Sequence, residues 1–288
     1  MDKQTTIKDE FMIVSRTPEN KPVTLHCIPY DDGIILDVKG KSQKLDPSII
    51  YIDSIPYTTA FKINGGVFTT PEHVLSALWG MGVDNCIISV DQYSMPFDAT
   101  SRSFVDQIKA VGVRELNKPR TYINIEKTHI IGNKTESMAI LKPANRLIIT
   151  LEIDYPNIMG NHKATYTWSP GSYDKKICDS RTRVCKPIDG ELTSWKEFRK
   201  YVKVLPKYPN KLSPYICFTD DRYIVSPRDS FELVAHKILD FIGDSSLLGQ
   251  RLYAHIYLYR TGHSFNNRLI KFIYNEYGKN KRNVERSV

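Results

Sequence analysis

Strand-like sequence precedes helix-like sequence twice along this chain of 288 residues. In the first half, short apolar runs at residues 23–30 and 33–38 are typical of strands, and helical spacing begins only near residue 70. In the second half, residues 146–155 alternate apolar and polar side chains, and residues 231–244 then follow helical spacing. Because grouped strands bury one face under later helices, this order predicts an α+β fold of two similar layered α/β sandwich domains.

A polar, proline-containing joint separates the two halves at Asn117-Lys118-Pro119-Arg120. We take it as the boundary between an N-terminal domain, residues 1–117, and a C-terminal domain, residues 118–288. Further strands are expected at residues 86–90, 121–131, 137–143 and 251–260, and further helices at residues 103–112, 194–204 and 266–277.

The charge pattern narrows the classes of partner. A formal net charge of +8 that is evenly spread does not indicate nucleic-acid binding, and it suits an anionic small molecule such as a nucleotide or a phosphorylated sugar. The polar N-terminus lacks a signal-peptide core, and no apolar stretch approaches the roughly 18 residues that span a bilayer. Five irregularly spaced cysteines favour a reducing compartment. We therefore expect a cytoplasmic monomer.

Two residues on one predicted helix could bind a metal ion. His236 and Asp240 are four residues apart, so they share a helix face. An imidazole and a carboxylate on adjacent turns can bind zinc, although the same spacing also fits a structural His–Asp pair.

A second candidate group lies in the first turn of the helix that begins near residue 70. Thr70 can cap this helix, and Pro71 suits its first position. Glu72 favours the positive end of the helix dipole, which is also a structural explanation for its presence. Because catalytic zinc sites use three protein ligands and one open position, His73 could complete the set, and Glu72 would be placed to accept a proton.

A third candidate group follows the last predicted strand. Gly262 permits close approach there, and His263 could act as an acid or base, although a capping or surface role is equally open. Asp244, four residues after Asp240, could orient His263 or simply be a helix-end carboxylate.

Three blocks of sequence together resemble one family, the UDP-3-O-acyl-N-acetylglucosamine deacetylases of lipid A biosynthesis. The first block comprises residues 69–78 with Gly80, Gly82, Asp84 and Asn85. The second comprises residues 236–244 with Leu248-Gly249, and the third comprises Thr261-Gly262-His263 with Asn266-Asn267 and Leu269. The blocks occur in the order that the family has, and they span nearly the whole chain.

The resemblance implies a zinc-dependent hydrolase of a linear amide bond, with the active site between the two domains and with iron(II) as another possible metal. It implies that His73, His236 and Asp240 bind the metal, that Glu72 is the general base and that His263 is the general acid. It also implies supporting roles for Lys237, which lends positive charge near the carbonyl, for Asp244, which supports His263, and for Thr182, which helps to hold the oxyanion.

The resemblance further implies substrate contacts. Lys142 and Tyr155 fall where the family contacts the nucleotide-sugar, and Asp98 matches an active-site aspartate. Arg183 departs from the family pattern, which has a phenylalanine-rich continuation after Thr182. A glycine-rich strand that the family has before the second block is also absent.

The departures gather where the family binds the acyl chain, so the reaction type is expected to be better preserved than the substrate. The leading hypothesis is removal of acetyl from a nucleotide-linked N-acetylated amino sugar. The alternatives are a relative that deacetylates a different N-acetyl substrate and a metal-binding relative without catalysis.

Overall fold

The computed structural model describes most of the chain. The described residues are 2–17, 21–51, 58–63, 65–96, 99–185, 215–219 and 221–278. None of the described helices is long and apolar enough to cross a membrane.

The N-terminal layer is a five-stranded sheet with strand order β2-β3-β8-β4-β5. Its strands are β2 (Phe11–Arg16), β3 (Pro22–Ile28), β4 (Ile34–Val38), β5 (Lys41–Lys44) and β8 (Cys86–Val90). The alternation in β3 buries Leu25 and Cys27 on the inner face. Helix α2 (Arg102–Val111) packs against β2 and against α1 (Glu72–Gly80).

Two smaller pairs of strands complete this half. Strand β1 (Lys3–Ile7) pairs with β9 (Val113–Pro119), and β6 (Ala60–Ile63) pairs with β7 (Gly66–Thr69), which leads into α1. A 3-10 turn, η1 (Pro47–Ile49), precedes the hairpin. The expected domain joint therefore lies at the end of β9, and the boundary at residue 117 stays a prediction.

The C-terminal layer is a sheet with strand order β11-β12-β18-β13-β14, and β10 pairs with β18. Its strands are β10 (Tyr122–Asn124), β11 (His129–Gly132), β12 (Met138–Lys142), β13 (Leu147–Asp154), β14 (Asn161–Thr167) and β18 (Arg251–Tyr259). Helix α5 (Ser230–Ser245) packs on β13 and β14, and α6 (His263–Ile273) packs on α5.

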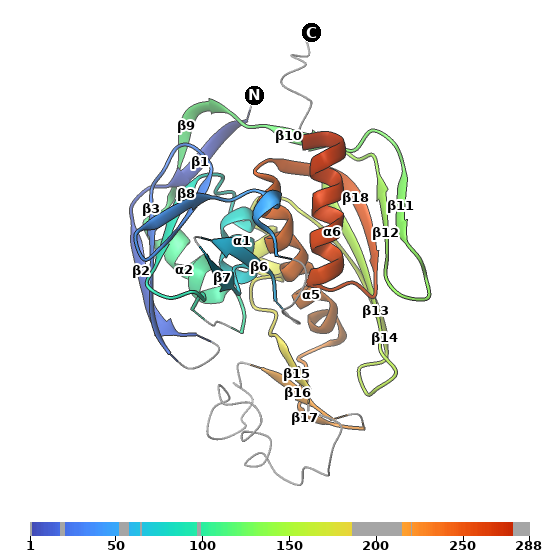
Figure 1. Ribbon diagram of the computed structural model, residues 1–288. Helices are drawn as coiled ribbons and strands as arrows, with labels where there is room; N and C mark the ends of the chain where they lie inside the picture. Colours follow the sequence, from blue (N-terminus) through green and yellow to red (C-terminus); the bar gives the residue numbers. More distant parts are fainter. Residues whose placement is uncertain are drawn as a thin grey trace.

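The helices lie between the two sheets, and the two layers meet where α1 packs on α5 (Figure 1). Gly243 makes this contact possible, because a Cβ at its position would lie 2.1 Å from the carbonyl oxygen of Glu72. Ser76 Oγ donates across the same interface to the carbonyl of Leu239 at 2.8 Å. The α+β prediction is confirmed, with helices and sheets segregated into layers.

A second contact, apart from the packing of α1 on α5, joins the two layers. The buried Arg251 guanidinium donates through Nε to Asp84 at 2.8 Å, and Arg120 Nε donates to the same carboxylate at 2.9 Å. Arg251 also lies over the ring of Trp79, 4.5 Å from its centroid. Because a buried arginine needs a charged partner, the Arg251–Asp84 ion pair favours the arrangement in which the two halves are in contact.

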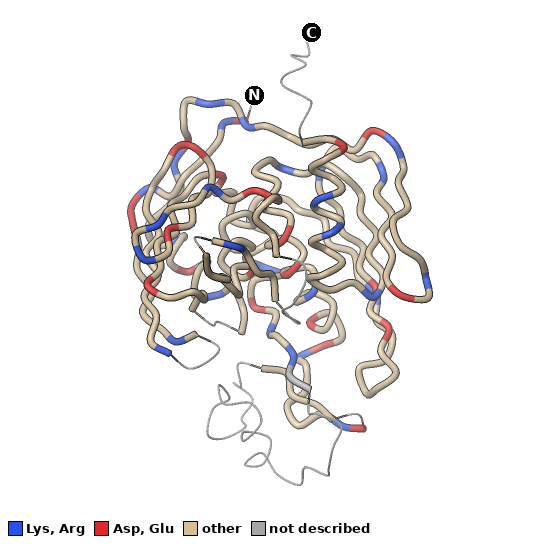
Figure 2. The backbone as a smooth tube through the Cα atoms, viewed as in Figure 1, with Lys and Arg blue, Asp and Glu red and all other residues tan. Residues whose placement is uncertain are grey.

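The remaining elements are short. They are α3 (Ser172–Lys176), β15 (Arg183–Cys185), β16 (Ile216–Phe218), β17 (Tyr223–Val225), η2 (Ser246–Leu248) and the π-helical turn η3 (Tyr274–Gly278). Strands β15, β16 and β17 form a small sheet at the lower edge of the molecule (Figure 1). Figure 2 shows basic and acidic residues interspersed over both layers, so the net positive charge forms no single stripe.

Two sequence-based predictions of secondary structure were wrong in detail. The single strand expected at residues 121–131 is two strands, β10 and β11, which pair with different neighbours. The helix expected at residues 266–277 already begins at His263, and its last turn widens into η3. The helix expected at residues 194–204 lies outside the described residues.

Candidate metal centre and active site

The chain enters α1 through an unusual turn. Thr70 has φ +60°, a left-handed conformation that is rare for a β-branched residue. Its hydroxyl donates to the carbonyl of Thr69 at 2.7 Å and does not cap α1. Pro71 is the residue that precedes the first helical turn. The prediction that Thr70 caps this helix was therefore wrong. The turn delivers Glu72 and His73 to the first helical turn, at the interface with α5.

Three buried side chains from the two helices form one group. His73 comes from α1, whereas His236 and Asp240 lie one turn apart on α5, and one potential ligand atom from each lies within 4.8 Å of the others. Nε2 of His236 is 3.4 Å from Asp240 Oδ1, and Nε2 of His73 is 3.9 Å from the same oxygen. Two imidazoles and a carboxylate are a donor set that zinc favours.

The second ring nitrogen of His236 fixes the tautomer. Nδ1 lies 2.9 Å from the carbonyl oxygen of Ser180, which can only accept, so Nδ1 carries the proton and the lone pair of Nε2 points to the group. Burial lowers the pKa of His236 to about 3 and keeps the ring neutral, as a metal ligand must be. Burial alone would raise the pKa of Asp240, but His236 and Lys237 lower it.

Glu72 is buried and held by the loop before β6. Thr58 Oγ1 lies 3.0 Å and 3.1 Å from the two carboxylate oxygens, and the backbone N–H of Thr59 donates to Oε2 at 3.3 Å. Burial raises the pKa of Glu72, although the charges of His263 and His73 oppose that shift. A carboxylate with a raised pKa is suited to accept a proton near neutral pH.

His263 lies on the other side of Asp240 and is oriented by a second carboxylate. Its Nδ1 donates to Asp244 Oδ2 at 3.1 Å, and its Nε2 is 3.7 Å from Asp240 Oδ2. Thr59 Oγ1 donates to Asp244 Oδ1 at 2.5 Å, and Asn266 Nδ2 donates to Oδ2 at 2.9 Å. Burial favours the neutral ring, but the carboxylates of Asp244, Asp240 and Glu72 raise the pKa of His263 to about 9.

Lys237, Tyr155 and Arg183 form a cluster beside Asp240. Lys237 Nζ donates to Asp240 Oδ2 at 3.1 Å. The Arg183 guanidinium lies over the ring of Tyr155, 5.3 Å from its centroid. Burial raises the pKa of Tyr155, but the charges of Arg183 and Lys237 outweigh it and lower that pKa. The three side chains therefore share one positively charged environment.

Thr182 lies in the segment that also supplies Ser180, and its backbone N–H donates to the carbonyl of Ala99 at 2.7 Å. A buried ion pair anchors this segment, because Arg181 Nε donates to Glu232 Oε1 at 2.8 Å. Burial alone would raise the pKa of Glu232, but hydrogen bonds from Arg181 and Arg228 lower it to about 2.

One residue with a predicted substrate role, Lys142, does not join this group. Lys142 pairs with His255 at one end of the C-terminal sheet, whereas Tyr155 follows β13 at the opposite end. Lys142 lies on the sheet face that points away from the helices. Asp98 lies outside the described residues.

The sequence did not point to the residues that hold the site in place. Thr58 and Thr59 hold Glu72 and Asp244, and the carbonyl of Ser180 orients His236. Each acts across a long sequence separation from its partner or through the backbone, so local spacing carried no signal for it.

The fold and the site together define a class of protein: an α+β sandwich with a buried His-His-Asp group where its two layers meet, flanked by a buried carboxylate and a carboxylate-bound histidine. The family model of UDP-3-O-acyl N-acetylglycosamine deacetylase matches residues 4–275, and the chain belongs to this family.

Curated relatives agree with this assignment. A UDP-3-O-acyl-N-acetylglucosamine deacetylase of Syntrophus aciditrophicus is 32% identical over 84% of this chain and 75% of its own length. The enzymes of the same name from Nautilia profundicola and Coxiella burnetii are each 30% identical, over 93% and 94% of this chain and 91% and 90% of their own lengths.

Proposed function

We propose that the protein is a zinc-dependent deacetylase that removes the acetyl group from UDP-3-O-acyl-N-acetylglucosamine. The observation that carries the proposal is the arrangement around the His73, His236 and Asp240 group, which has a buried carboxylate on one side and the His263–Asp244 pair on the other. The names of the family and of its relatives supply the substrate.

The donor set fits a divalent metal ion. Two neutral imidazoles and one carboxylate leave at least one coordination position for water or substrate. A zinc or iron(II) ion held there would supply Lewis acidity, which polarises an amide carbonyl and makes water a stronger acid. Lys237 bonds to Asp240 Oδ2 and leaves Oδ1 toward the two histidines, which supports Oδ1 as the donor atom.

Two residues carry the proton transfers, one as a general base and the other as a general acid. Glu72 accepts the proton of the attacking water, because burial gives it a higher affinity for protons than an exposed carboxylate has. His263 is protonated at neutral pH and donates its proton to the leaving amine. Asp244 keeps the ring of His263 oriented and stabilises its charged form.

We assign the developing oxyanion and the substrate to the side of the group on which Lys237, Tyr155 and Arg183 lie. Lys237 offers a positive charge there, and Thr182 follows the segment that orients His236. Tyr155 and Arg183 are placed to contact the nucleotide-sugar beside Lys237. Retention of both proton-transfer groups together with the ligands argues against a relative that only binds metal.

Metal analysis of purified variants tests the ligand assignment. His236→Ala is expected to lose bound metal and turnover together, because only two protein donors remain. His162→Ala, a half-buried histidine on β14, is the matched control and should keep both. Wild-type metal content in His236→Ala would reject the assignment.

Turnover tests the substrate separately. The protein should hydrolyse the 3-O-acylated UDP-N-acetylglucosamine and should act poorly on the unacylated sugar. Activity confined to unacylated acetamido sugars would reject the substrate and leave the reaction type standing.

A further inference from the structure

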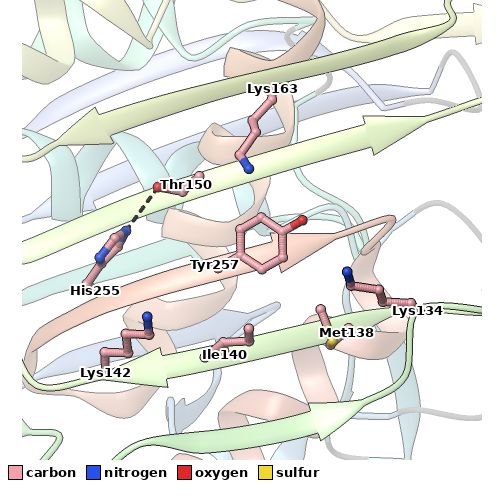
Figure 3. Close-up of a pocket in the computed structure, with 8 residues that line it drawn as sticks. All are labelled: Lys134, Met138, Ile140, Lys142, Thr150, Lys163, His255 and Tyr257. Carbon is pink, nitrogen blue, oxygen red and sulfur yellow. Dashed lines mark hydrogen bonds between the residues drawn. The ribbon is translucent and has the colours of Figure 1, made fainter.

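The outer face of the C-terminal sheet carries a pocket that the proposed reaction does not use. Figure 3 shows seven of its residues on β12, β13, β14 and β18 and Lys134 in the turn before β12, with side chains that stand on the side of the sheet opposite the helices. The pocket has a volume of about 360 Å³. Its floor comprises Met138, Ile140 and Tyr257, and we call it the sheet-face pocket.

Three lysines surround this floor. Lys134 lies in the turn between β11 and β12, Lys142 on β12 and Lys163 on β14, and all three line the pocket (Figure 3). Lys163 lies over the Tyr257 ring, 4.9 Å from its centroid, and 3.4 Å from Glu152. Neither Lys134 nor Lys142 has a carboxylate of the described residues within 4.0 Å. The pocket therefore has surplus positive charge above an apolar floor, which favours an anionic ligand with an apolar part.

Exposed apolar surface extends the floor beyond the pocket. Ile130 on the edge strand β11 is directly opposite Ile140 in the β11–β12 ladder, so both side chains lie on the same face. Ile130 is 68% exposed. An isolated phosphate ion would make no use of this isoleucine, whereas a lipid surface would cover it.

We propose that this face binds the phosphate headgroups of an anionic membrane, with the three lysines around the phosphates and with Ile130 at the acyl boundary. Lysines near an anionic bilayer each contribute electrostatic attraction, and a neighbouring apolar side chain adds insertion. The proposal is independent of the deacetylase assignment, because it uses no residue of the metal group.

Vesicle flotation tests it without any substrate. The wild-type protein should bind phosphatidylcholine vesicles that contain about 30% phosphatidylglycerol and should not bind pure phosphatidylcholine vesicles. Lys134→Gln/Lys142→Gln/Lys163→Gln should weaken binding at least about tenfold, because each lysine contributes about fivefold. Lys8→Gln/Lys175→Gln/Lys176→Gln removes the same charge from exposed sites elsewhere and should change binding less than about twofold.

Ile130→Ser separates a lipid from a free anion. It should weaken vesicle binding several-fold at constant charge, and millimolar inorganic phosphate should displace neither this variant nor the wild-type protein from the vesicles. Equal losses in the two lysine variants would show that only net charge matters and would overturn the proposal. An undiminished Ile130→Ser variant, or displacement from vesicles by millimolar phosphate, would indicate a free-phosphate site instead. Unchanged melting temperatures in all variants show that the comparison is between folded proteins.

Discussion

The contact between Gly243 and Glu72 makes the site sensitive to a single methyl group. In Gly243→Ala, the new Cβ would lie 2.1 Å from the carbonyl oxygen of Glu72, 2.8 Å from its carbonyl carbon and 2.9 Å from its Cα. Ordinary contact begins at 3.4 Å, and the obstacle is backbone, so no side chain can rotate away. Helices α1 and α5 must therefore separate by more than about 1 Å.

The separation has a structural and a functional cost. Overpacking costs about 1–3 kcal/mol, and alanine in place of a helical glycine recovers up to about 1 kcal/mol. We expect a net loss of about 1–2 kcal/mol and a melting temperature lower by roughly 2–8 °C. Because the proposed ligands lie on both helices, metal affinity falls, and a shift of about 1 Å in Glu72 lowers kcat/KM by about 100-fold.

Gly262→Ala is the matched control. Gly262 precedes His263, has φ −151°, and a Cβ there would meet no heavy atom within 4 Å. We expect its free energy of unfolding to stay within about 0.5 kcal/mol of wild type, with unchanged turnover. Calorimetry, metal analysis and steady-state kinetics compare the two variants. Wild-type metal content and kcat/KM in Gly243→Ala would refute the argument that the helix contact positions the site.

Three further predictions concern charged groups. Glu72→Gln should keep the metal and lower kcat by about 10²–10⁴-fold, as metal analysis and turnover can check. His263 must be protonated to act as an acid, so activity should fall as pH rises through about 9, and His263→Gln should remove this limb of the pH–rate profile. The lowered pKa of Glu232 stabilises the fold above the ordinary carboxyl pKa of about 4.3, and this contribution of up to about 3 kcal/mol is lost as pH falls through about 2. Glu232→Gln should abolish that dependence in urea unfolding and cost about 3–5 kcal/mol, because the buried Arg181 would lose its ion pair with Glu232.

The sequence predicted the elements that have strong local patterns. The alternation in residues 146–155 became β13, and the helical spacing of residues 231–244 became α5. The local pattern wrongly predicted one strand at residues 121–131, because the strand-like composition continues throughout this segment. In the structure, β10 pairs with β18, and β11 pairs with β12. Pairing partners are tertiary information, and a single segment does not contain them.

In the candidate site, too, local spacing predicted some features, and others became visible only in the tertiary structure. Spacing alone placed His236 and Asp240 on one helix face, and the structure adds that His73 reaches them from the other layer. The threonines at positions 58 and 59 escaped notice because a hydroxyl gives no signal until the fold brings a carboxylate to it. Thr70 was expected to cap a helix, but its left-handed backbone turns its hydroxyl toward Thr69 instead.

Two of the contacts that matter for the proposed chemistry cross between the two layers. His73 meets Asp240, and Thr59 meets Asp244, from opposite halves of the chain. The Arg251–Asp84 pair is a further contact between the same two layers. Neither half can assemble the site alone, so any perturbation that separates the layers should reduce metal affinity and proton transfer together. A variant that loses only one of these functions must act within a layer, as Glu72→Gln does.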